Sequence, residues 1–139
     1  MSEASTSTRI AVVVRDDLET WQKLNVAAFL VSGIGTRWPD LVGEPYEDAD
    51  GVEYLPMFVT PVVVFAGPAA AVRRGFDRAL DRGLRPAVYP DVLWDTYNDA
   101  DNRAGVRGIP TEKLSLAGFA VAGERRTVDK ALDKLKLHR

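Results

Sequence analysis

A chain of 139 residues with 46% hydrophobic and 27% charged residues has the size and composition of one ordinary globular domain with a sizeable core. Its net charge of −2 excludes a global attraction to nucleic acid or to an anionic membrane. The absence of cysteine excludes disulfides, thiolate catalysis and thiolate metal sites.

The first residues, 1–8, lack the basic start and the apolar core of a signal peptide. We therefore expect a disordered leader at 1–8, followed by a single α/β domain over 9–139. No apolar run reaches the ~18 residues that a membrane-spanning helix requires. We expect a cytoplasmic protein that does not associate with membranes.

The first element is a β-branched run over 9–15, which is typical of a strand covered on both faces. Two aspartates follow, and either Asp16 or Asp17 is expected to cap the next helix. Asp16 with Glu19 three residues later fits an acidic capping box.

The next segment is almost wholly apolar, since Asn25 is the only polar side chain between Leu24 and Val31. This pattern predicts a central helix that is buried on all sides. Gly33 and Gly35 are expected to end it.

An acidic segment after this helix carries Asp50-Gly51, which predicts a β-hairpin. The same segment could begin a calcium-binding loop. Counting from Asp48, however, puts Glu53 where such a loop needs glycine and Val59 where it needs glutamate. The hairpin is therefore the better interpretation.

Three further apolar runs predict strands at 60–66, 85–89 and 114–122, beside the first strand at 9–15. Apolar residues recur at helical spacing between Pro68 and Gly83 and again around Val128, which predicts two further helices. The polar residues 92–110 between the third and fourth strands are expected to form an excursion over the sheet edge. The sequence thus predicts a three-layer α/β/α fold with a mixed four-stranded sheet.

Most catalytic motifs are missing. The only histidine, His138, is one residue from the end of the chain, which excludes most histidine-dependent hydrolase mechanisms. The first strand is followed by Arg15-Asp16-Asp17 instead of a glycine-rich loop, and these carboxylates would repel a pyrophosphate.

Two basic stripes could form an electrostatic surface for RNA. Acidic residues lie three or four positions from most of these bases, so helix faces that neutralise themselves are the favoured interpretation. The stripes are Arg74, Arg78 and Arg82, with Asp77 and Asp81, and Arg126, Lys130 and Lys134, with Asp129 and Asp133.

Long parts of the chain resemble an uncharacterised family catalogued as domain of unknown function 2000. The segments that carry the resemblance are IAVVVRDDLETWQKLNVAAFLVSGIG, VGEPYEDADG and LAGFAVAGERRTVDKALDKLKL, and it covers roughly 9–137. That family is similar in fold to the type 2 peptidyl-tRNA hydrolases, so the resemblance implies a fold of that type.

The segments VVVRDDL and GLRPAVYPD also look like the hydrolase strands that lead to the active site. This similarity implies that Asp91 stands at the position of the hydrolase aspartate and Lys23 near the hydrolase helix lysine. The chain departs from the pattern elsewhere. Residues 25–29 lack the glutamine and histidine of the hydrolase helix, and Asp95 replaces a threonine that is found one position later, as Thr96.

Two functions of different class follow. In the first, a hydrolase acts on peptidyl-tRNA or a related acyl ester, with Asp91 activating water and Lys23 stabilising negative charge on a carbonyl oxygen. In the second, the fold is a small-ligand or protein-binding module without that reaction, and it binds through residues 94–102 and the sheet edge. We favour the second because the expected partners of Asp91 are missing. No metal or cofactor is expected, and the ligand-binding candidates beside Lys23 and Asp91 are Asp17, Asn25, Trp94 and Thr96.

Each main candidate also has a simpler structural explanation. Lysine is mostly exposed, so Lys23 could be a solvated side chain. The amide of Asn25 could satisfy a buried backbone group. Asp91 could cap the segment that begins at Val92.

The apolar helix over Leu24–Val31, with the loops at Trp38 and Trp94, offers more apolar surface than a small sheet can cover. The sequence therefore predicts a homodimer.

Overall fold

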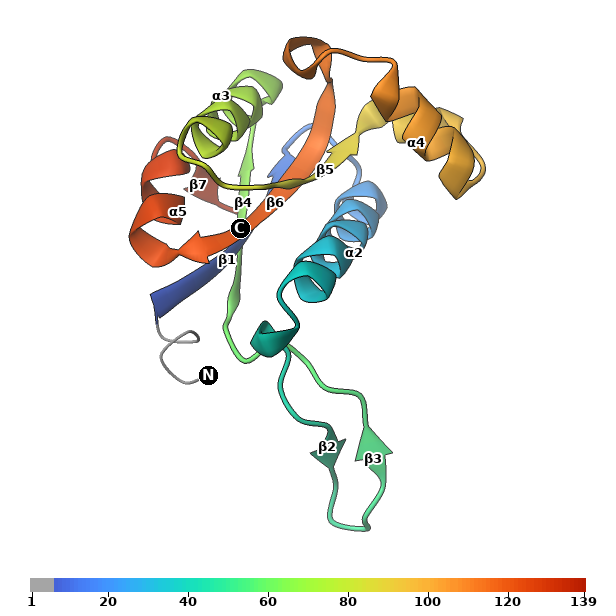
Figure 1. Ribbon diagram of the computed structural model, residues 1–139, viewed down its shortest axis with the longest axis vertical. Helices are drawn as coiled ribbons and strands as arrows, with labels where there is room; N and C mark the ends of the chain where they lie inside the picture. The colour runs from blue at the N-terminus through green and yellow to red at the C-terminus, as the bar shows by residue number, and fades with distance from the viewer. Residues whose placement is uncertain (1–6) are drawn as a thin grey trace.

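Residues 7–139, which the computed structural model describes, contain a five-stranded sheet in the order β5-β6-β1-β4-β7, with helices on both faces (Figure 1). The strands are β1 (Thr8–Arg15), β4 (Val62–Gly67), β5 (Ala87–Pro90), β6 (Leu116–Glu124) and β7 (Lys136–Leu137). The α-helices of this part of the chain are α2 (Thr20–Arg37), α3 (Ala69–Asp81), α4 (Asp99–Arg107) and α5 (Arg125–Ala131). None of these helices is long and apolar enough to cross a membrane.

The α/β class and the mixed sheet are confirmed, but the sheet has five strands and not four. β1 is parallel to β4 and antiparallel to β6, and β5 is antiparallel to β6. The additional strand, β7, pairs Leu137 with Phe65 of β4. Two residues are too few to show a strand periodicity, so β7 could not be predicted from its own residues.

β1 begins at Thr8, one residue before the predicted strand and inside the expected leader. Residues 1–6 of that leader lie outside the described residues. The structure therefore corrects only the end of the predicted leader.

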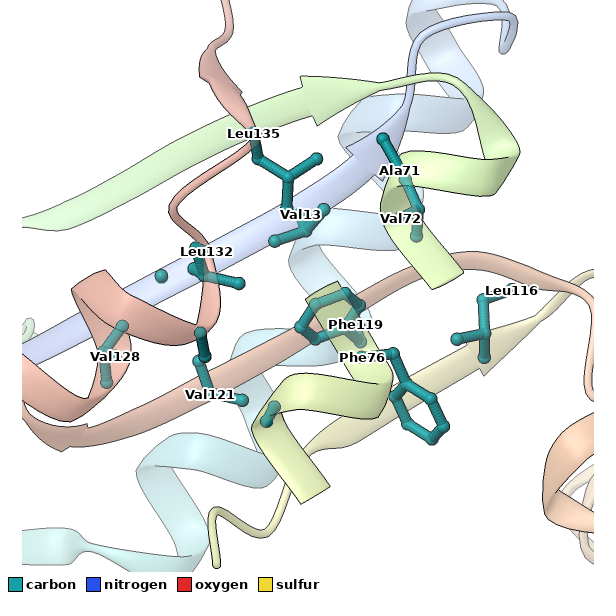
Figure 2. Close-up of a cluster of buried hydrophobic side chains, with 13 residues drawn as sticks. Val13, Ala71, Val72, Phe76, Leu116, Phe119, Val121, Val128, Leu132 and Leu135 are labelled. Atoms are coloured by element: carbon teal, nitrogen blue, oxygen red, sulfur yellow. The ribbon is translucent and has the colours of Figure 1, made fainter. Parts of the chain in front are cut away.

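Side-chain size alternates along β6 and distinguishes the two faces of the sheet. Phe119 and Val121 point to one face, where they pack with side chains of α3 and α5 (Figure 2). Gly118, Ala120 and Ala122 face α2, which packs over them through Val26, Leu30 and Ile34. Small residues under α2 let this helix lie close to the sheet.

The helix α2 is buried on one face only, so the prediction of a helix buried on all sides is wrong. Val26, Leu30 and Ile34 are buried, whereas Trp21, Leu24 and Phe29 are 61%, 68% and 60% exposed. Asn25 is exposed as well. Apolar composition could not distinguish a helix covered by its own chain from one that presents an apolar face to solvent.

Both ends of α2 also differ from the prediction. Glu19, not Asp16 or Asp17, is the N-cap, and it forms a reciprocal capping box with Gln22. The helix continues past Gly33 and Gly35, which have negative φ angles, and ends at Trp38. Trp38 precedes a proline, which disfavours helical backbone at that residue.

The predicted hairpin is confirmed as β2 (Tyr46–Glu47) and β3 (Glu53–Tyr54). Gly51 adopts a φ of 83° in its turn, a conformation that favours glycine. The hairpin extends away from the sheet beyond the C-terminal end of α2 (Figure 1). It is a projecting arm and not part of the three layers.

The predicted excursion over 92–110 contains more regular structure than expected. A 3₁₀-helix, η2 (Asp91–Asp95), follows β5 directly, and α4 follows after a short loop. The Asn98 side chain caps α4 by accepting a hydrogen bond from the Asp101 backbone N–H at 2.8 Å. These elements form one wall of the cleft described below.

Gly118 provides a test of the close packing of β6 against the β1 backbone and α2. A Cβ atom at this position would lie 2.5 Å from the Val13 carbonyl oxygen and 3.0 Å from Val26 Cγ1. We expect Gly118→Ala to lower the free energy of unfolding by about 1–3 kcal/mol, as overpacked cores do. Urea denaturation measures the difference.

Gly105→Ala is the matched control, because the nearest heavy atom to a Cβ at this helical position is 3.8 Å away. This change should be neutral or should stabilise α4 by up to about 1 kcal/mol. Equal unfolding free energies for the two variants would contradict the packing argument.

Candidate functional site

The carboxyl ends of β1, β4 and β5 and the start of β6 meet at one edge of the sheet. This follows from the pairing, since β1 is parallel to β4 and both β1 and β5 are antiparallel to β6. Arg15 ends β1, Asp91 follows β5 and Ser115 precedes β6. The topology therefore brings three polar side chains from distant parts of the sequence together.

The three side chains are joined at the carboxylate of Asp91. Ser115 Oγ donates a hydrogen bond to Asp91 Oδ2 at 2.6 Å, and Arg15 Nη1 donates to the same oxygen at 3.1 Å. The Asp91 backbone N–H donates to the Ser115 carbonyl at 2.8 Å, which extends the β5–β6 pairing by one residue. Asp91 thus ties the end of β5 to its neighbour β6 and to β1, the next strand beyond it.

Arg15 is the centre of the local charge arrangement. Its side chain is only 15% exposed, and its Nε also pairs with Asp17 Oδ1 at 3.0 Å. Burial alone would lower the pKa of Arg15, but hydrogen bonds and attraction from Asp17 and Asp91 outweigh it and raise the pKa. The guanidinium stays charged and is shared by two carboxylates.

The predicted pair of Asp91 and Lys23 does not form in this arrangement. Lys23 Nζ lies 3.3 Å from His138 Nε2, beside the edge strand β7, while Asp91 lies at the β5 edge. Arg15 provides the cation that Lys23 was expected to provide. Asp91 is also not a helix cap, because Pro90 occupies that position and no side-chain cap bond is made.

The other predicted ligand-binding residues are divided among separate places. Asp17 joins the Arg15 cluster, whereas Asn25 lies on the exposed face of α2. Thr96 lines a cleft between α2, β5, η2 and α4, whereas Trp94 packs against the core and the Tyr89 ring. The structure therefore does not bring Asp17, Lys23, Asn25 and Asp91 into the one cleft that was predicted for them.

This cleft has a volume of about 760 Å³. Phe29 and Tyr89 line it, with ring centroids 6.0 Å apart, and Trp94, which does not line the cleft, packs on Tyr89 with ring centroids 5.8 Å apart. Burial raises the pKa of the Tyr89 hydroxyl, and an interaction with the Trp94 indole lowers it by a smaller amount. The indole N–H is buried and makes no hydrogen bond of normal geometry to residues 7–139.

The opposite side of the cleft is polar. Thr96 Oγ1 donates to the Leu93 carbonyl at 2.8 Å and also contacts the Asn102 side chain. Arg103 Nε pairs with Asp99 Oδ2 at 2.8 Å on the exposed surface of α4. The cleft therefore offers aromatic faces on one side and amide, hydroxyl and guanidinium groups on the other.

A second hollow of about 520 Å³ adjoins the cleft along α2 and β5. Ser32, Gly33 and Ala87 line both hollows. Arg37, whose guanidinium lies 5.3 Å from the Trp38 ring centroid, and Arg85 lie in the second hollow. Over residues 7–139, no group of three His, Asp or Glu side chains is placed to bind a metal ion.

Sequence reasoning missed Arg15, Ser115 and Arg103, although the predicted binding segment 94–102 includes the cleft residues Asp99 and Asn102. A charged residue at the end of a buried strand was a usable signal for Arg15, because such a side chain must find a partner at the sheet edge. Ser115 and Arg103 gave no signal, since their positions depend on pairing between distant segments.

Comparison with known families matches residues 8–139 to the family described as "Protein of unknown function (DUF2000)". The chain belongs to this family, as its segments indicated. Among solved structures it is similar to that of the protein of unknown function Atu0240 from Agrobacterium tumefaciens strain C58. The two share 39% sequence identity and a TM-score of 0.93, over 96% of this chain and 98% of that chain. No curated protein matches the chain. The similarity to the type 2 peptidyl-tRNA hydrolases stays a prediction.

The Arg15 cluster can be tested by the stability of two variants. Arg15→Met removes the cation between Asp17 and Asp91, and we expect the free energy of unfolding to fall by about 1–2 kcal/mol, allowing for partial solvent screening. Lys23→Met, at the position first expected to pair with Asp91, should change it by less than about 0.5 kcal/mol. Urea denaturation at neutral pH measures both. Equal losses would show that Lys23 shares the structural role assigned to Arg15.

Proposed function

We propose that the protein is a ligand-binding module whose site is the cleft between α2, β5 and α4. The ligand that fits its chemistry has a flat apolar ring and an anionic or strongly polar group. The observation that carries this proposal is the combination of an aromatic base with a polar wall in one cleft of about 760 Å³, a size in the usual range for small-molecule sites.

The aromatic base supports binding of a ring. Phe29 and Tyr89 line the cleft with ring centroids 6.0 Å apart, and Trp94 packs on Tyr89 from outside the lining. These ring contacts hold Tyr89 in place, so binding needs little further ordering of this side chain.

The polar wall supports an anionic group. Within residues 7–139, Arg103 pairs with Asp99 through Nε, so its terminal amino groups are able to donate to a ligand carboxylate. Asn102 provides an amide beside Arg103. A ligand that spans both sides of the cleft would contact α2 and α4 together.

The contacts of Asp91 weigh against the alternative, hydrolysis of peptidyl-tRNA or a related acyl ester. Asp91 Oδ2 already accepts hydrogen bonds from Ser115 and Arg15. This oxygen is occupied by two protein donors and is not free to accept a proton from water, as a general base must. Lys23 lies beside His138 and is not placed to stabilise charge next to Asp91.

Aromatic carboxylates, with 3-phenylpropionate and indole-3-acetate as probes, test the binding site. We expect them to shift the Trp94 indole N–H resonance, assigned with Trp94→Phe, and to raise the melting temperature. Arg103→Gln should weaken this binding about tenfold, as loss of a charge-assisted hydrogen bond does. Arg107→Gln is the control, because Arg107 carries the same charge on α4 but does not line the cleft. Equal weakening in both variants, or no shift at Trp94, would contradict the proposed site.

We also propose that the module is a homodimer that pairs through the exposed face of α2. No charged residue occurs between Lys23 and Arg37, and Trp21, Leu24 and Phe29 are mostly exposed there. Ala28 and Ser32 on the same side leave room for a second helix to approach. Phe29 belongs to this face and to the cleft wall, so a second copy would form part of the ligand site.

Ala28 lies near the middle of α2, where a two-fold axis would place it opposite itself. The chain has no cysteine, so Ala28→Cys provides a single thiol. A short bis-maleimide should cross-link this variant into dimers, and light scattering of the unmodified chain should give twice 15.3 kDa. Ala70→Cys, at an exposed alanine on α3, is the matched control and should stay uncross-linked. A unit of 15.3 kDa at high micromolar concentration would overturn the dimer.

A further inference from the structure

The second hollow continues the cleft along α2 toward the C-terminal end of that helix. Ser32, Gly33 and Ala87 line both spaces. At their boundary α2 contacts β5, where a Cβ atom on Gly33 would lie 3.5 Å from the Ala87 Cβ. Neither Gly33 nor Ala87 carries more than a methyl group, so no long side chain separates the two spaces at this point. The cleft and the second hollow are therefore continuous.

The second hollow carries positive charge. Its lining contains two arginines, Arg37 at the end of α2 and Arg85 before β5, and no acidic residue. Within residues 7–139, neither arginine forms an ion pair or donates a side-chain hydrogen bond. Arg103, the arginine of the cleft, is by contrast paired with Asp99. The uncompensated positive charge of the two joined spaces therefore lies in the second hollow.

The acidic groups near the second hollow belong to a different space. Asp40 and Glu124 line a smaller hollow of about 150 Å³, which shares only Trp38 with the second hollow. In the described chain, neither carboxylate pairs with Arg37 or Arg85. The carbonyl groups at the end of α2 carry a partial charge of about −0.5, which is smaller than the two positive charges of the arginines. The second hollow therefore attracts an anion.

Trp38 supports one of the two guanidinium groups. The Arg37 guanidinium lies 5.3 Å from the centroid of the Trp38 ring, a distance that gives a cation–π interaction. Trp38 packs against the core of the domain, so its ring is a fixed support. A ring face does not replace an oxygen acceptor, so the N–H groups of Arg37 stay available, as do those of Arg85. An anion in the second hollow can therefore accept hydrogen bonds from both side chains.

The donors of the second hollow suit a phosphate monoester better than a carboxylate. A phosphate monoester carries about −1.5 to −2 charges at neutral pH and three acceptor oxygens, which match two guanidinium groups. Ser32 Oγ and Thr36 Oγ1 donate to the Phe29 and Ser32 carbonyls, respectively, so these hydroxyls are already engaged. Arg37 and Arg85 are therefore the principal donors of the second hollow.

We propose that the cleft and the second hollow form one site for a small aromatic compound that carries a phosphate monoester, such as a 5′-mononucleotide. The aromatic ring lies over Phe29 and Tyr89 in the cleft. The phosphate binds to Arg37 and Arg85, and a spacer of the size of a ribose passes over Gly33. This inference rests on the proposed ligand-binding function and adds the class of ligand.

Titration calorimetry with adenosine 5′-monophosphate and adenosine measures the contribution of the phosphate, and the uridine pair tests a smaller ring. We expect each monophosphate to bind at least about tenfold more tightly than its nucleoside, since charge-assisted hydrogen bonds are added. Arg37→Gln and Arg85→Gln should each weaken binding of the monophosphates about tenfold and leave binding of the nucleosides unchanged. Arg74→Gln is the matched control and should change neither, because Arg74 is an exposed arginine of α3, on the opposite face of the sheet.

A variant at the boundary tests whether the two spaces act together. Gly33 has a negative φ, and an added Cβ has its nearest heavy atom at 3.5 Å, so a side chain is compatible with the fold. Gly33→Leu places a side chain between the cleft and the second hollow and should weaken binding of the monophosphates at least about tenfold. Binding of 3-phenylpropionate, which occupies only the cleft, should change by less than about threefold. Gly105→Leu, at a glycine of α4 that lines neither space, is the control and should leave both ligands unaffected.

The outcomes separate this inference from the proposed function. Equal affinities for each monophosphate and its nucleoside would overturn the phosphate site and leave the cleft as a ligand site. Binding of 3-phenylpropionate without binding of any monophosphate would have the same meaning. Equal weakening of the monophosphates by Arg85→Gln and Arg74→Gln would also overturn the phosphate site, because net charge would then govern affinity. If neither the monophosphates nor 3-phenylpropionate bind, the proposed function and this inference are overturned together.

Discussion

The close packing of α2 on β6 is the contact on which the rest of the structure depends. Gly118, Ala120 and Ala122 present almost no side-chain volume to the helix, so Val26, Leu30 and Ile34 can rest directly on the sheet. On the opposite face of β6, Phe119 and Val121 fill the wider space below α3 and α5. One strand thereby places the helical layers on its two faces at different distances from the sheet.

The close packing of α2 on the sheet determines both surfaces to which we assign a function. The side of the helix that faces away from the sheet stays exposed, with Trp21, Leu24 and Phe29 in solvent. The same position makes Phe29 a wall of the cleft over Tyr89. The proposed ligand site and the proposed dimer face thus both depend on α2, and a change in the distance between this helix and the sheet would affect both.

Local patterns in the sequence were sufficient to predict four strands of the main sheet and most helices. The runs that became β1, β4, β5 and β6 were identified within a few residues, and so was the turn at Asp50-Gly51, because these features depend on neighbouring side chains. The burial of α2 was overestimated, since an apolar helix face looks the same in sequence whether its own chain or another molecule covers it. The pairing of Leu137 with Phe65 could not be seen, because it depends on where the chain end returns.

The candidate site was recovered only in part for a related reason. Asp91 was correctly placed at the end of a strand on the carboxyl edge of the sheet, and Asp17 was placed near it. Its partners were not found, because Arg15 and Ser115 reach Asp91 through the register of three strands. The prediction chose Lys23 by similarity of position along a helix, but the side chain of Lys23 lies toward the opposite edge of the sheet.

The outer strands of the sheet have a further consequence. β5 has four residues and ends in proline, and β7 has two, while the long strands β1 and β6 lie inside the sheet. Unpaired backbone at a long sheet edge recruits strands from other chains and leads to fibres. Here each edge presents too little backbone for such growth. The chain therefore exposes an apolar helix face and an apolar hairpin, while its sheet offers little free backbone on which a strand of another chain could add.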